Sequence, residues 1–141
     1  MEQPYRVAGR RSPAPATQLD EVWIAVVSQL RDGPFAGLAF LTGGRSLGAR
    51  VACRTARETN SIAVLCLAFP LHPPGRPEKS RLAELDAVNI PTLVVQGESD
   101  PFGTPPEGPT RTVIRVPGTH SFRSSATIAA AVSEWLARLA P

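Results

Sequence analysis

The segment TGGRSLGAR, residues 42–50, directly follows the apolar run LAFL. Within the segment, Ser46 lies midway between Gly44 and Gly48. The pattern G-x-S-x-G on a tight turn from a strand to a helix is typical of a serine nucleophile. Such a serine is held in strained backbone, where side chains two residues away on either side would collide. The following helix would direct its first N–H groups at the site, so the N–H of Leu47 becomes a donor for a developing oxyanion.

Two other interpretations of this segment are a glycine-rich turn without chemistry and a phosphate-binding loop. The P-loop requires GK[ST] after four variable residues, which the segment lacks. Its glycines also miss the spacing of the dinucleotide-binding pattern G-x-G-x-x-G. Because a serine needs a base and an orienting acid to act as a nucleophile, the rest of the chain decides between catalysis and a plain turn.

Short apolar runs without polar alternation, typical of buried parallel strands, alternate along the chain with stretches of helical spacing. The runs are LAFLT (38–42), SIAVLCLAF (61–69), PTLVVQG (91–97) and TVIRV (112–116), and the helical stretches are 17–32, from 47 on, 81–88 and 128–139. Thr17 is the predicted N-cap of the first helix. The sequence therefore predicts one α/β domain over residues 1–141, with a mostly parallel sheet of about four strands and with residues 1–16 as a proline-rich loop or tail.

An acid and a base follow two of these strands. Asp100 lies in QGESDPFG after the third strand, and His120 lies in VPGTHSF after the fourth. Asp100 alone could be an Asx-turn residue, and His120 alone could be an ordinary loop histidine. Together with Ser46 they have the chain order Ser, Asp, His of α/β-hydrolases, each at the carboxyl end of a predicted strand, where an open α/β sheet places its site. We therefore predict a catalytic triad.

The composition argues against several other classes of protein. The net charge of +3 comes from scattered arginines, and aromatic residues make up only 6%, which does not favour a nucleic-acid or membrane surface. Cys53 and Cys66 lack metal-ligand spacing and are predicted to be free buried thiols, as in a reducing compartment. No apolar run approaches the roughly 18 residues of a membrane span, and no signal peptide is evident. We predict a cytoplasmic protein that uses no metal or other cofactor.

Four motifs together resemble a known family: GGRSLGAR, FPLHPPGRPEKSR, VVQGESDPFG and GTHSF. It is the α/β-hydrolase-like family of the testis-expressed protein thirty and the third subunit of the NSL histone acetyltransferase complex. The match is closest to bacterial members labelled dienelactone-hydrolase-like, and it covers roughly Gln3 to the C-terminus. The resemblance implies a three-layer fold with Ser46 as nucleophile, His120 as base and Asp100 as its partner. It implies no substrate, and some eukaryotic members serve as complex subunits.

The HPPGRPEK loop is a mark of this family, and it follows the second predicted strand. Its residues His72, Arg76 and Lys79 could border the mouth of the active site. One interpretation is a proline-stiffened cover. The other is that Arg76 and Lys79, together with Arg45, attract an anionic substrate such as a carboxylate.

The resemblance also implies that this chain lacks the N-terminal strands and the oxyanion loop of the full fold, because only 45 residues precede Ser46. We therefore expect the C-terminal two-thirds of a hydrolase domain. The LAFLT strand would then have a bare edge, which favours a homodimer or another partner. The proline-rich connection after Asp100 leaves little room for a crossover helix and puts the reach of His120 in question.

The predicted function is a serine hydrolase acting on a small ester-like acyl substrate through Ser46, Asp100 and His120. One alternative is a hydrolase-fold scaffold with little or no activity that binds a partner. The other is an anion-binding module formed by the helix N-terminus after Gly44 with Arg45, Arg76 and Lys79.

Overall fold

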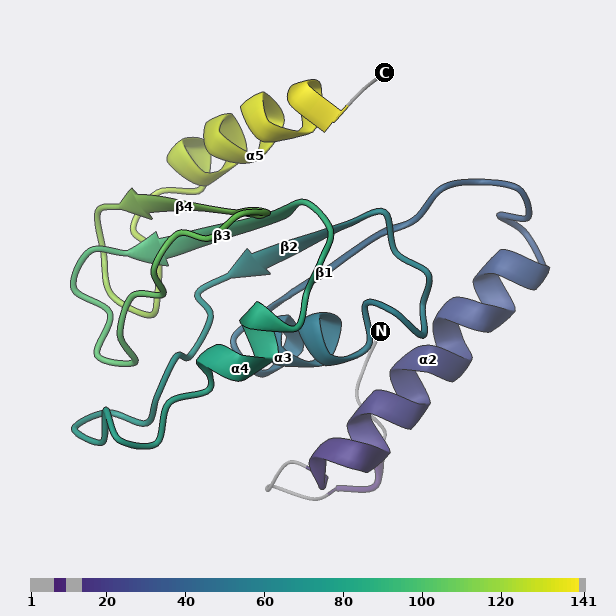
Figure 1. Cartoon of the computed structure of the whole chain (residues 1–141), viewed down its shortest axis with the longest axis horizontal. Coiled ribbons are helices and arrows are strands. Elements are labelled where there is room, and N and C mark those ends of the chain that lie inside the picture. The colour runs from purple at the N-terminus through teal and green to yellow at the C-terminus, as the bar shows by residue number, and fades with distance from the viewer. Residues whose placement is uncertain (1–6, 10–13, 140–141) are drawn as a thin grey trace. The chain divides into compact units, whose positions relative to one another are not determined.

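The computed structural model describes residues 7–9 and 14–139 (Figure 1). Residues 1–6 and 10–13 of the predicted tail lie outside the described residues. The chain forms two compact units, Met1–Leu38 and Ala39–Pro141. No helix of the described part is long and apolar enough to cross a membrane.

The first unit contains the helix α2, Ala16–Asp32. Its predicted end at Asp32 is confirmed, but the prediction of Thr17 as N-cap is wrong. The cap position is Pro15, whose carbonyl accepts the N–H of Leu19 at 3.2 Å. A fixed proline φ just before the first turn already suits the start of a helix, so the helix begins without a side-chain cap.

The second unit is a four-stranded parallel sheet in the order β1-β2-β3-β4, and the predicted α/β class is confirmed. Its strands are β1 (Leu41–Arg45), β2 (Ala63–Leu67), β3 (Thr92–Gly97) and β4 (Arg111–Val116), and its helices are α3 (Leu47–Arg54), α4 (Leu82–Asp86) and α5 (Ser125–Leu139). Three strands fall where the apolar runs predict them.

The first strand differs from the prediction, because β1 begins at Leu41 and continues through both glycines to Arg45. Pairing with β2 explains the shift: Leu41 lies opposite Ala63 and Gly44 opposite Cys66. A Cβ atom at Gly43 would lie 2.6 Å from the Leu65 carbonyl oxygen, so the close approach of the two strands requires glycine. Outside this pairing, Leu38 is exposed.

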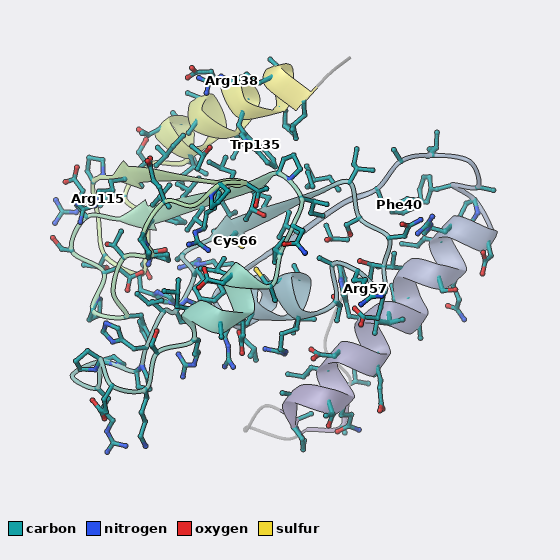
Figure 2. All side chains as sticks on the ribbon, viewed as in Figure 1. Phe40, Arg57, Cys66, Arg115, Trp135 and Arg138 are labelled. Atoms are coloured by element: carbon teal, nitrogen blue, oxygen red, sulfur yellow. The ribbon has the colours of Figure 1, made fainter. Side chains whose placement is uncertain are left out.

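Helices cover both faces of the sheet, as a three-layer fold requires (Figure 1). On one face, α3 and α4 pack over a core that includes Val64, Cys66 and Val94. On the other face, Trp135 of α5 is buried in a cluster with Leu93 and Val95 of β3, and Figure 2 shows it between helix and sheet. The central strand β3 is consequently buried along its whole length.

Because all four strands are parallel, their carboxyl ends lie at one edge of the sheet. The loops that leave β1, β3 and β4 at this edge carry the three predicted triad residues. The connection of residues 98–110 between β3 and β4 contains no helix, in agreement with its proline content. A short crossover therefore suffices to carry the chain to β4.

Candidate active site

Ser46 occupies the sharp turn between the last residue of β1 and the first residue of α3. Its φ of 52° and ψ of −114° lie in a region that a side chain other than glycine rarely adopts. The turn is held on both sides: the Ser46 N–H donates to the Leu67 carbonyl of β2 at 3.0 Å, and the Ser46 carbonyl accepts N–H groups of Ala49 and Arg50. This is the strained strand-to-helix geometry expected of a nucleophile elbow.

The two flanking glycines are not equivalent. A Cβ atom at Gly44 would lie 2.4 Å from the carbonyl carbon of Gly48, so the predicted steric need is confirmed for Gly44. At Gly48 a Cβ atom would meet nothing within 4 Å, and the prediction that this position is sterically closed is wrong. The collision is one-sided because the missing side chain of Gly44 faces the backbone of Gly48.

The structure brings Ser46, His120 and Asp100 together. His120 Nε2 lies 2.8 Å from Ser46 Oγ, and His120 Nδ1 lies 2.9 Å from Asp100 Oδ2. The Asp100 side chain is fully buried, whereas the His120 side chain keeps 21% of its surface exposed. A buried acid and a partly accessible base suit a site that must admit a substrate to the serine.

Gln96 is a polar residue of the site that the sequence reasoning missed. Its side chain is fully buried in β3, and its Nε2 donates to Asp100 Oδ2 at 2.8 Å and to the carbonyls of Phe69 and Gly103 at 3.1 and 2.8 Å. All three neighbours are acceptors, so the amide nitrogen must face them. The signal in the sequence is a lone glutamine inside the apolar run PTLVVQG, where a polar side chain in a buried strand needs hydrogen-bond partners.

This network determines which nitrogen of His120 carries the proton. Asp100 Oδ1 accepts the N–H of Phe102 at 2.9 Å, and Oδ2 accepts Gln96 Nε2. A carboxylate offers only acceptors, so His120 Nδ1 must be the donor in its contact with Asp100. Nε2 of a neutral imidazole is then unprotonated, and it can accept the Ser46 hydroxyl proton.

Two further contacts surround the histidine. The rings of Phe102 and His120 have centroids 4.3 Å apart with an interplanar angle of 39°. The side chain of Phe102 therefore limits the rotation of the imidazole from one side. In addition, the N–H of Ser99 donates to the Gly118 carbonyl at 3.0 Å, which ties the loop of the acid to the loop of the base.

The N–H of Leu47 is available at the start of α3. Leu47 is the first residue of the helix, and within residues 7–9 and 14–139 no acceptor is bonded to its N–H. The first N–H groups of a helix carry partial positive charge and suit an oxyanion. The predicted oxyanion donor thus lies next to the nucleophile in an unbonded state.

The residues that the sequence predicts to bind substrate lie on separate segments of the chain. Arg45 donates to the His120 carbonyl and to Ser121 Oγ in the loop of the histidine. The N–H of His72 donates to the Phe102 carbonyl at 3.0 Å, and its ring lies against Gly103, so the HPPGRPEK loop borders the loop of the acid. Arg76 and Lys79 are exposed, and no described contact joins either side chain to the triad.

The two cysteines lie in the core between α3 and the sheet, Cys53 on α3 and Cys66 on β2. Both thiols are free and buried, with their sulfur atoms 3.5 Å apart. The hydrogen bond with Cys53 and burial raise the pKa of the Cys66 thiol. Among the described residues no group of three or more His, Cys, Asp or Glu side chains is placed to hold a metal ion.

Comparison with known proteins identifies the family. Residues 1–127 match the family described as alpha/beta hydrolase domain. The chain belongs to this family. The α/β hydrolase chain is also similar to the crystal structure of an α/β serine hydrolase from Xanthomonas campestris described as having no lid, with a TM-score of 0.71 and 23% sequence identity.

That structural likeness shows the fold of the α/β hydrolase chain. The alignment covers 94% of this chain and 62% of the Xanthomonas chain, so this chain spans about three-fifths of the length of that hydrolase. A comparison with curated proteins gave no match.

Proposed function

We propose that the chain is a serine hydrolase that acts on ester-like acyl substrates through Ser46, His120 and Asp100. The observation that carries this proposal is the continuous line of contacts from Ser46 Oγ through His120 to Asp100, at 2.8 and 2.9 Å. A serine in strained backbone, a base in hydrogen-bond reach and a buried acid that orients the base are the parts that acyl transfer needs. Membership of the α/β hydrolase domain family supports the same assignment.

In the proposed reaction, Ser46 Oγ attacks the acyl carbonyl carbon while its proton passes to His120 Nε2. Asp100 accepts the hydrogen bond from the Nδ1–H group throughout and stays ionised, which stabilises the imidazolium, and the Leu47 N–H donates to the oxyanion of the tetrahedral intermediate. Collapse of the intermediate breaks the bond to the alcohol, which leaves with the proton from Nε2. Water then attacks the acyl-enzyme with His120 as base and releases the acid.

The substrate class is a second part of the proposal. The motif HPPGRPEKSR supports the finer resemblance to the dienelactone-hydrolase-like members of the family named above. Exposed Arg76 and Lys79, on the loop that borders the loop of the acid, would favour a substrate with a carboxylate. Equal turnover of a carboxylate ester and its neutral amide-capped analogue would contradict this preference.

The proposed setting is the cytoplasm, because the two buried thiols are close together and not joined. Fluorescence of a tagged full chain in cells would test this, and an exported fraction would contradict it.

A non-catalytic role as a partner-binding scaffold is the second candidate. It is favoured by the position of β1, which is an outermost strand of the sheet formed by the described residues. An unpaired strand edge can add a strand from another chain. A stable homodimer or heteromeric complex of a chain without hydrolase activity would support this role.

The decisive experiment is the intact mass of the purified chain after treatment with a fluorophosphonate, beside Ser46→Ala and His120→Ala. We expect one adduct on the unsubstituted chain, none on Ser46→Ala and a much slower reaction of His120→Ala. Circular dichroism of all three would show that folding is retained. A folded, soluble chain without an adduct would contradict the hydrolase proposal and leave the scaffold role.

A further inference from the structure

Arg45 connects the elbow to the loop that carries the histidine. It directly precedes Ser46, and its Nη2 donates to the backbone carbonyl of His120 at 3.1 Å and to Ser121 Oγ at 3.3 Å. Its guanidinium carbon lies 5.9 Å from the centre of the Phe122 ring, within the range of a cation–π contact. One side chain thus contacts three consecutive residues of the loop.

The loop is otherwise held at positions on either side of His120. Before it, Gly118 accepts the N–H of Ser99. After it, Phe122 forms a bridge with Gly118 and packs against the core beneath α5. At His120 and Ser121, Arg45 joins the loop to the end of β1, directly before the nucleophile.

We propose that Arg45 is a positioning residue that holds His120 at the correct distance from Ser46, and that it does not bind substrate. This inference rests on the proposed hydrolase function. Arg45 and Ser46 are neighbours in the same turn. A hydrogen bond from Arg45 to the His120 carbonyl therefore fixes the position of the base relative to the nucleophile. A displacement of about 1 Å at a reacting pair can slow a reaction by about a hundredfold.

The choice of arginine is consistent with this task. A planar guanidinium can donate to two acceptors and lie over an aromatic ring in the same geometry. A lysine ammonium would reach the carbonyl as a point charge and would not place a guanidinium over the Phe122 ring. We therefore expect Arg45→Lys to retain part of the effect of Arg45, and Arg45→Met to retain none of its hydrogen bonds.

Positioning and substrate binding predict different kinetics. If Arg45 positions His120, Arg45→Met lowers kcat and the rate of labelling by an uncharged fluorophosphonate, and KM changes little. If Arg45 binds an anionic substrate, the same change raises KM for a carboxylate ester and leaves the labelling rate unaltered. The labelling rate separates the two roles because the probe carries no charge for Arg45 to attract.

The experiment compares Arg45→Met and Arg45→Lys with Arg115→Met, a matched control on the exposed surface of β4 (Figure 2). We expect labelling about tenfold slower in Arg45→Met, an intermediate rate in Arg45→Lys and the unsubstituted rate in the control. Equal labelling rates in Arg45→Met and the control would overturn the inference.

Amide hydrogen exchange gives a readout that does not depend on activity. We expect faster exchange across residues 118–122 in Arg45→Met than in the unsubstituted chain and in Arg115→Met. Unchanged exchange would overturn the inference whatever the labelling rate. If the unsubstituted chain is not labelled at all, the hydrolase proposal fails, while faster exchange in Arg45→Met still supports the role of Arg45 in holding the loop.

Discussion

Gly97 and Thr119 meet at a point where no side chain fits. A Cβ atom at Gly97 would lie 2.1 Å from the carbonyl oxygen of Thr119. Gly97 ends β3 three residues before Asp100, and Thr119 directly precedes His120. The φ of Gly97 is not positive, so close approach and not backbone freedom requires glycine here. The end of β3 and the loop of the base therefore lie so close together that only a hydrogen atom fits at position 97.

Gly97→Ala is expected to displace the base. The added methyl group must push the backbone of residues 118–119 away from β3, because the colliding atoms belong to the backbone and cannot rotate away. We expect fluorophosphonate labelling to slow by about a hundredfold and the free energy of unfolding to fall by about 1–3 kcal/mol. Labelling at the unsubstituted rate would show that the close approach of Gly97 and Thr119 does not place His120.

The elbow offers a matched pair of glycine substitutions. Gly44→Ala places a methyl group 2.4 Å from the carbonyl carbon of Gly48, so we expect a loss of about 1–3 kcal/mol in the free energy of unfolding. Gly48→Ala places the same group in open space on the first turn of α3, where alanine is favoured by about 1 kcal/mol. Urea unfolding measures both, and equal destabilisation would contradict the one-sided collision.

Gln96→Glu tests the support of the acid. The substitution preserves shape but replaces a donor 2.8 Å from Asp100 Oδ2 with a second carboxyl group in a fully buried place. Two such groups cannot both be charged at this distance, so one must keep a proton. The unfolded chain releases that proton at a lower pH, so the variant loses stability as the pH rises from about 4 to 7.

Gln96→Met is the control for this charge effect. It removes the same three hydrogen bonds without adding an ionisable group, so its loss of about 1–3 kcal/mol should not change over the same pH range. Urea unfolding at several pH values compares the two variants. Parallel curves would mean that position 96 does not face the carboxylate of Asp100.

The order of elements could be predicted from the sequence because each signal is local. Short apolar runs without polar alternation, such as those of β2 and β3, are typical of strands buried on both faces of a parallel sheet, and the glycine pattern around Ser46 implies a turn. The extent of β1 could not be predicted in this way. Its register against β2 brings Gly43 and Gly44 into the strand and leaves Leu38 outside, and that pairing joins residues about 20 positions apart.

The same distinction applies to the site. Ser46, Asp100 and His120 each follow a strand, and parallel strands bring these ends to one edge, so their proximity could be predicted. The hydrogen bond from Arg45 to the His120 carbonyl could not be predicted, because the two residues lie 75 positions apart. Such a contact depends on the path of a loop, which no local pattern encodes. Gln96 and Asp100 are closer to each other in sequence. Their contact nevertheless depends on which face of β3 points toward Phe69, because the Gln96 side chain lies on that face.

The two buried thiols of Cys53 and Cys66 predict a loss of stability in alkali. The hydrogen bond with Cys53 and burial raise the pKa of Cys66 above its ordinary value of 9.0. Above that pH the unfolded chain releases a proton that the folded chain retains, so stability is fully present below pH 9.0 and falls as the pH rises, by up to about 1.4 kcal/mol per unit. Cys66→Ala should be less stable at pH 7, because it loses buried contacts, but should lose less stability between pH 9 and 10.5. Urea unfolding across this range compares the two chains, and parallel curves would show that Cys66 retains no proton on folding.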